Sequence, residues 1–196
     1  MSIHSLTMKH TRTNLSDADT RREAIVEAAL VAFADAGFQA TPVTAVAARA
    51  GISQAYVFKL FPTKEELFIA AVERCFTRIE ETLEKSAQTV SSGDADAILY
   101  AMGDGYASLI ADRSILMIQV HAQSASDVPA IRATMRGGLK RIVTYVKQRT
   151  GASDEAVQRF IAFGQLCHLI TTTAIDGLGE DWAQLVARGI RHVPAI

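Results

Sequence analysis

The chain has 196 residues, of which 49% are hydrophobic, and a formal net charge of −1, which alone argues weakly against a nucleic-acid partner. That length suits one domain of ordinary size or a small domain joined to a larger one. The polar start lacks a secretory signal, no apolar run is long enough to span a membrane, and Cys75 and Cys167 allow one pair at most. We therefore expect a cytoplasmic protein with reduced thiols and no membrane association.

The charge is unevenly distributed along the chain. Residues 1–64 carry seven Lys/Arg and five Asp/Glu, a net charge of +2, while the remainder has a net charge of −3. Between Ala28 and Lys64 the only acidic residue is Asp35. An N-terminal segment with so few acidic side chains is able to approach phosphates, although the asymmetry is small.

Residues 1–18 are expected to form a flexible arm, and the first helix follows. Thr20 and Glu23 have the spacing of a capping box at its start. Apolar residues then recur at helical spacing as far as Gly37, which occupies the expected C′ position.

Two short helices come next. Thr41 and Pro42 are typical of the N-cap and first residue of a helix, which Gly51 is expected to end. Ser53 is expected to cap the third helix, which ends before Pro62 because a residue preceding proline avoids the helical region.

Long helices account for the rest of the chain. Thr63 and Glu66 form another capping box, which opens a fourth helix that runs to about Ser86. Further apolar helices are expected at about 94–111, 113–125, 129–150, 154–176 and 182–190. The pattern predicts an all-α fold of about nine helices, with an N-terminal domain at 19–66 and a second domain at 67–196.

The second and third helices are joined by the tight turn Ala50-Gly51-Ile52, which is typical of a helix-turn-helix. With Val57 and Phe61 buried against the first helix, the third helix exposes Gln54, Ala55, Tyr56, Phe58 and Lys59. Glutamine can bond adenine in the major groove, aromatic rings can contact thymine methyls, and lysine can bind phosphate. The predicted DNA contacts are Thr41, Thr44, Gln54, Ala55, Tyr56, Phe58, Lys59 and Lys64.

Three segments carry a resemblance to a known family: AIVEAALVAFADAGF, TPVTAVAARAGIS and YVFKLFPTKEELF. In order and spacing they resemble the DNA-binding domain of the TetR family of transcriptional repressors, over about residues 20–68. The resemblance implies a homodimer that reads a palindromic operator, with a C-terminal domain that holds a small-molecule inducer and the dimer interface. Two positions depart from the family pattern: Phe58 replaces a phosphate-binding tyrosine, and Leu60 replaces an aromatic residue or histidine. We expect weaker, salt-sensitive operator binding as a result.

Candidate residues in the C-terminal half lie on apolar helices, where ordinary core packing is the competing interpretation. The predicted ligand pocket consists of Met102, Tyr106, Met117, His121, Phe160 and His168. The predicted dimer interface consists of Phe160, Gly164, Cys167, Thr171, Trp182 and Val186. An apolar or aromatic small molecule is the expected inducer.

An enzymatic function is not expected. Cys167 and His168 are adjacent and point about 100° apart on a helix, so they cannot form a nucleophile–base pair. No zinc-like spacing and no phosphate-binding glycine loop is present, so we predict no catalytic residue, no metal and no cofactor. Two alternatives remain open. One is a regulator of the same fold that acts as an activator, or as a repressor with no inducer, and the other is a helical binding module whose helix-turn-helix no longer holds DNA.

Overall fold

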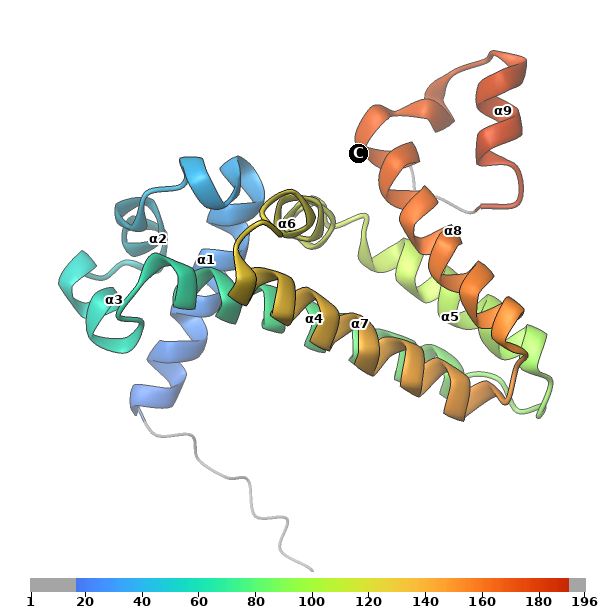
Figure 1. Cartoon of the computed structure of the whole chain (residues 1–196), viewed down its shortest axis with the longest axis horizontal. Coiled ribbons are helices and arrows are strands. Elements are labelled where there is room, and N and C mark those ends of the chain that lie inside the picture. Colours follow the sequence, from blue (N-terminus) through green and yellow to red (C-terminus); the bar gives the residue numbers. More distant parts are fainter. Residues whose placement is uncertain (1–16, 191–196) are drawn as a thin grey trace, which may run out of the picture.

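The computed structural model describes residues 17–190, and nearly all of the expected arm at 1–18 lies outside this range. Within the described residues the chain forms α-helices and one short 3-10 helix, without strands, so the predicted all-α fold is confirmed (Figure 1). The elements are α1 (Asp17–Ala40), α2 (Val43–Ala50), α3 (Gln54–Leu60), α4 (Lys64–Gln88), α5 (Ala95–Leu109), α6 (Arg113–Ser124), α7 (Pro129–Thr150), α8 (Asp154–Thr173), η1 (Ile175–Gly177) and α9 (Asp181–Ala187).

The start of α1 differs from the sequence-based prediction. The helix begins at Asp17, so Thr20 lies inside it and the predicted capping box is wrong. Near the other end, Gly37 has φ 77° and ψ 175°, which interrupts the helical backbone before the last residues of the element. A positive φ of this size favours glycine, because a Cβ atom would be strained there.

Thr41 does not cap α2, as the sequence had suggested. Pro42 occupies the N-cap position and no side chain caps the helix. Thr41 is buried instead, and its hydroxyl lies 2.7 Å from the carbonyl oxygen of Gly37 and 3.2 Å from that of Ala32. The hydroxyl therefore bonds carbonyl groups of α1, and the backbone amide of Thr41 also donates to the carbonyl oxygen of Gly37, at 3.3 Å.

The other predicted caps around α3 are confirmed. Gly51 ends α2 in the left-handed conformation, with φ 67°. Ser53 Oγ accepts a hydrogen bond from the amide of Tyr56 at 3.2 Å, and α3 ends before Pro62. Thr63 Oγ1 accepts from the amide of Glu66 at 3.0 Å and opens α4. These local bonds fix where a helix of only 7 residues begins and ends.

α4 connects the two ends of the molecule. Its first turns pack on α1, where the rings of Phe33 and Phe68 meet edge to face at 4.9 Å. Glu27 of α1 accepts hydrogen bonds from Arg74 and Arg78 of α4. Further along, α4 lies beside α7 and α5, while α8 follows α5 at the end away from α3 (Figure 1). Buried residues from both predicted domains form one continuous core.

The C-terminal helices are shorter than predicted. The helix expected at 154–176 ends at Thr173, because Ala174 adopts a left-handed conformation with φ 52° and a 3-10 turn follows. The helix expected at 182–190 covers Asp181–Ala187. A small second core formed by Ile170, Ile175 and Ala183 holds these elements together. No helix in the described range of 17–190 has the length and apolar character needed to cross a membrane.

Candidate DNA-binding surface and ligand cavity

α3 is anchored by its apolar side and presents its polar side to solvent. Val57 is fully buried, and Phe61, just after the helix, is 2% exposed. The predicted contact residues Gln54, Ala55, Phe58 and Lys59 are exposed and Tyr56 is half-buried. The short helix thus depends on its neighbours for stability, and its outward side chains are available to a partner.

The tyrosine and lysine of α3 lie on the same side of the helix. Lys59 Nζ is 6.0 Å from the centroid of the Tyr56 ring, within the range of a weak cation–π interaction. Such a pair can place a positive charge beside an aromatic ring that is able to contact a base or sugar. The exposed Thr44 of α2 lies in the first turn of that helix.

Two further predicted contacts have a different environment from the one expected. Thr41 is 2% exposed, so its predicted DNA contact is corrected: the hydroxyl is bonded inside the protein. Lys64 is half-buried, its Nζ donates to the carbonyl oxygen of Gln39 at 2.9 Å, and it lies 5.4 Å from the centroid of the Phe38 ring. Burial lowers the pKa of Lys64. Its ammonium group therefore also bonds a backbone carbonyl group at the end of α1.

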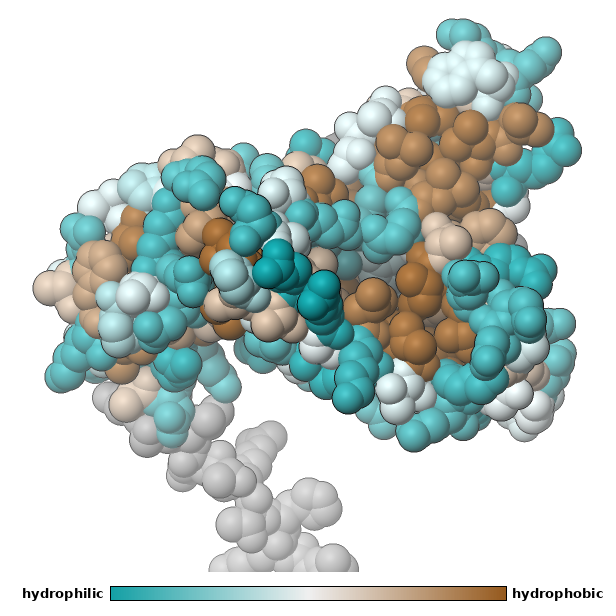
Figure 2. All heavy atoms as spheres, viewed as in Figure 1, coloured by the Kyte–Doolittle hydropathy of each residue, from teal (hydrophilic) through white to brown (hydrophobic). Residues whose placement is uncertain are grey.

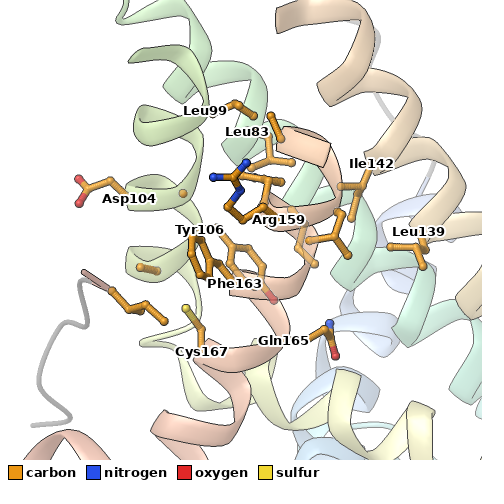
Figure 3. Close-up of a pocket in the computed structure, with 18 of the residues that line it drawn as sticks. Leu83, Leu99, Asp104, Tyr106, Leu139, Ile142, Arg159, Phe163, Gln165 and Cys167 are labelled. Carbon is orange, nitrogen blue, oxygen red and sulfur yellow. The ribbon is translucent and has the colours of Figure 1, made fainter. Parts of the chain in front are cut away.

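A large cavity lies between α4, α5, α7 and α8. Its volume is about 770 Å³, a size typical of small-molecule sites, and apolar side chains dominate its walls. Figure 2 shows hydrophobic residues gathered in this hollow between α7 and α8. Figure 3 shows Leu83, Leu99, Leu139, Ile142 and Phe163 around the space.

The predicted pocket residues divide into two groups. Tyr106 and Phe160 line the cavity as expected. Met102, Met117, His121 and His168 do not line it, and their assignment to the pocket is corrected. Met102 is fully buried in the main core and Met117 packs against that core. Helical spacing identified these side chains as inward-facing but could not distinguish a cavity wall from close packing.

Tyr106 connects the cavity to a buried polar network. Its hydroxyl lies 2.6 Å from Nε2 of His168 and donates to Oε1 of Gln119 at 3.2 Å. Because Gln119 Nε2 already donates to the carbonyl oxygen of Ile115, Oε1 is the acceptor, so His168 Nε2–H donates to the phenol oxygen. Among residues 17–190 the remaining ring nitrogen, Nδ1, has no hydrogen-bond partner, and its lone pair is buried. Burial lowers the pKa of His168 to about 4, so the imidazole is neutral.

Three residues predicted for the dimer interface also line the cavity, and one of them, Phe160, was predicted for the pocket as well. Phe160, Gly164 and Cys167 all line it, at positions 4 and 3 residues apart on one face of α8. Burial raises the pKa of the Cys167 thiol to about 11, so the thiol is protonated and is not an activated nucleophile. The positions Thr171, Trp182 and Val186 lie outside the cavity.

The end of the molecule formed by α8 and α9 exposes large apolar side chains (Figure 2). We call this set the α8–α9 patch: Phe163, Leu169, Leu178, Trp182 and Leu185. The exposed fraction of Leu185 is 64% and that of Trp182 is 50%. Exposed apolar side chains gathered in one region are characteristic of interaction surfaces.

Sequence reasoning missed the part of the cavity that α7 supplies, together with Arg136 and Arg159. Leu139 of α7 is 44% exposed and lines the cavity. The only sign of this part of the cavity in the sequence was the apolar stripe of α7, which arginine residues interrupt. Among residues 17–190, no group of three or more His, Cys, Asp or Glu side chains is placed to hold a metal ion.

These features define a helix-turn-helix protein with a helical second domain that contains a cavity. The sequence model described as "Bacterial regulatory proteins, tetR family" matches residues 25–71. Residues 25–71 therefore form a domain of that family, and the recognition made from the three sequence segments is confirmed. The matched segment is therefore similar to the DNA-binding domains of bacterial transcription regulators.

Known proteins extend this comparison. The HTH-type transcriptional repressor KstR of Mycobacterium tuberculosis is 33% identical over 67 residues, which are 34% of this chain and 30% of that relative. A TetR-like regulator from Rhodococcus sp. RHA1 has a TM-score of 0.63 and 21% identity, over 88% of this chain and 93% of that one. FadR from Bacillus subtilis, solved with stearoyl-CoA, has a TM-score of 0.65 and 16% identity, over 87% and 100% of the two chains. The matching stretch thus spans less than a third of the curated repressor, and the structural likeness concerns the fold.

Proposed function

We propose that this chain is a transcriptional repressor that binds a palindromic operator as a homodimer and leaves it when a small molecule enters the cavity. The observation that carries the proposal is the exposed face of α3, where Gln54, Tyr56 and Lys59 are available to bases and phosphates. The depletion of acidic residues around this helix agrees with a phosphate-rich partner. The N-terminal likeness to the KstR repressor supports repression rather than activation.

The α8–α9 patch supports the homodimer. A second copy would cover Leu169, Trp182 and Leu185, whose exposure is otherwise unfavourable in water. An interface formed by one patch on both copies gives two-fold symmetry, which matches the symmetry of a palindrome. The two α3 helices must then lie about one turn of DNA apart to enter successive major grooves.

Coupling between the cavity and α3 would run through α6. Gln119 and Gln123 of this helix line the cavity, and Gln123 donates to Gln165 of α8 at 2.8 Å. The opposite side of α6 packs on α1, which carries the helix-turn-helix. A ligand that contacts α6 can favour one orientation of α1 over another, and only this difference in affinity between the two states would release DNA. The structure of FadR with stearoyl-CoA is consistent with an apolar ligand in this fold.

The proposal is tested by DNA binding with the full chain. DNA from the promoter region upstream of the gene that encodes this chain is titrated at several salt concentrations in a gel-shift assay. We expect salt-dependent retardation, and we expect Tyr56→Ala to abolish it while Thr144→Ala, on the exposed side of α7, leaves it unchanged. Absence of a salt-dependent shift would favour the binding-module alternative, and a shift that raises transcription in a reporter assay would favour an activator.

A further inference from the structure

Two arginines line the cavity without a hydrogen-bond or ion-pair partner among residues 17–190. Arg136 comes from α7 and Arg159 from α8. Within the described part of the chain, neither guanidinium group donates a hydrogen bond or forms an ion pair. By contrast, Arg74, Arg78 and Arg141 are all paired with glutamates of neighbouring helices. The charge of these two arginines is therefore available to a molecule that enters the cavity.

The acidic residues of the same lining do not offset this charge directly. Asp104 already has an interaction of its own, and in Figure 3 its carboxylate points away from the space that Arg159 occupies. Asp96 lies in the first turn of α5, where the free amide groups of the helix start stabilise a negative charge. Both carboxylates thus interact with groups of the protein, whereas the two guanidinium groups have no such interaction among residues 17–190.

Both arginines are exposed to solvent, and they line a cavity whose other walls are mostly apolar. Figure 3 shows Arg159 together with Leu83, Leu99 and Tyr106, which also line the cavity. A guanidinium group can bond two oxygens of a carboxylate or a phosphate through the two N–H groups of its fork, so the arginines can hold a charged head while an apolar chain contacts the walls. The rest of the wall offers dispersion contacts and few polar partners.

We propose that the cavity takes an anionic amphiphile: an apolar chain that fills the space between α5, α7 and α8, with a carboxylate or phosphate head bound by Arg159 and Arg136. The inference rests on the proposed function in that it treats the cavity as the ligand site. It narrows the ligand from any apolar or aromatic molecule to one with a negative head. A carboxylate and a phosphate share the required chemistry and are separated by the test.

The test uses small-molecule probes that share the same alkyl chain length and differ in their head group. Isothermal titration of the full-length protein, without DNA, compares dodecanoate, dodecyl phosphate and dodecyltrimethylammonium below their micelle concentrations. We expect at least one of the anions to bind with a dissociation constant about tenfold or more below that of the cation, as one charge-assisted hydrogen bond would give. The anion with the lower dissociation constant shows whether the site prefers a carboxylate or a phosphate head group.

Matched variants assign the effect to the two arginines. Arg159→Met and Arg136→Met keep an unbranched apolar stem and remove the charged guanidinium group, and each should reduce anion binding about tenfold while leaving the cation unchanged. Arg159→Lys should retain part of the preference. Arg113→Met, at an exposed arginine outside the lining, is the control and should change neither. Circular dichroism confirms that each variant is folded.

The outcomes separate this inference from the proposed function. Equal affinity for the three probes, preference for the cation, or anion binding that survives both Arg→Met changes would overturn the inference even if the protein binds an operator. Anion binding that depends on Arg159 but never releases DNA would leave the inference standing and contradict the proposed inducer mechanism.

Discussion

His121 of α6 lies against Gly37 of α1, so closely that a Cβ atom built on Gly37 would come within 2.8 Å of the imidazole Nδ1. Gly37 also accepts the hydrogen bond from the buried hydroxyl of Thr41, directly before α2. The contact therefore joins the helix that borders the cavity to the point where the helix-turn-helix begins. His121 thus has a packing role between the two parts of the chain, in place of the ligand contact that the sequence suggested.

Replacing Gly37 by alanine should destabilise the protein for two separate reasons. The positive φ of 77° strains any residue with a Cβ atom, and the new methyl group would collide with His121. We expect the free energy of unfolding to fall by about 2–4 kcal/mol in urea denaturation.

Gly151→Ala gives a reference for a milder case. Gly151 has φ 63° and ψ 11°, in the left-handed helical region, and nothing lies within 4 Å of a Cβ atom, so this variant should cost less than Gly37→Ala, whose ψ of 175° is essentially restricted to glycine. A second test combines Gly37→Ala with His121→Ala, which should recover part of the loss. A loss for Gly37→Ala that is the same in the wild-type and the His121→Ala backgrounds would show that the His121 contact has no energetic consequence.

Local signals in the sequence were sufficient for the helix-turn-helix. Gly51, Ser53 and Thr63 act through bonds to residues at most four positions away, and these bonds form as the motif indicates. Thr41 misled the prediction because its hydroxyl bonds backwards to α1, a choice that depends on how α1 and α2 meet. A threonine before a proline carries no sign of that geometry.

The cavity could not be located from one sequence for a physical reason. Its wall combines residues of α4, α5, α7 and α8 that are far apart in the chain, and the gap depends on how those helices pack. Met102 and Tyr106 lie one helical turn apart, yet the first is fully buried in the core and the second reaches the cavity. Helical periodicity gives the direction of a side chain but not what lies opposite it.

Phe58 offers a gain-of-affinity test of the DNA-binding surface. Its ring is 38% exposed on α3, where the resembled family has a tyrosine that meets a phosphate. Phe58→Tyr restores a hydroxyl donor and should tighten operator binding by about 1 kcal/mol, or about fivefold, in fluorescence anisotropy. Thr144→Tyr adds a phenol at an exposed position of α7, outside both the cavity and the α8–α9 patch; it is the control and should leave affinity unchanged. A weaker or unaltered complex with Phe58→Tyr would mean that this position does not face a phosphate.

His168 should make stability depend on pH in a defined window. Burial lowers its pKa to about 4 in the folded protein, against an ordinary value of 6.5 in the unfolded chain. The unfolded chain therefore binds the proton more tightly, so the free energy of unfolding falls as the pH drops from 6.5 towards 4, by about 3 kcal/mol over the whole window. Above pH 6.5 this contribution to the pH dependence vanishes.

The measurement compares urea denaturation of the wild-type protein and His168→Gln at several pH values. The amide side chain can still donate to the Tyr106 hydroxyl but does not titrate between pH 4 and 6.5. Because the carboxylates titrate alike in both proteins, the difference between the two pH profiles isolates His168. Parallel profiles from pH 7 down to pH 4 would contradict the assigned environment.

Leu185 tests whether the α8–α9 patch holds two copies together. Its side chain is 64% exposed, and a partner that covers it would have to desolvate any charge placed there. Leu185→Glu should raise the dissociation constant of the dimer about tenfold or more in sedimentation equilibrium and weaken binding to a palindromic operator in parallel, because each half-site needs its own α3. Thr144→Glu adds the same charge to an exposed position of α7 and should alter neither quantity. If Leu185→Glu leaves the dimer intact, the two copies meet through another surface, and the spacing of their α3 helices must be set there.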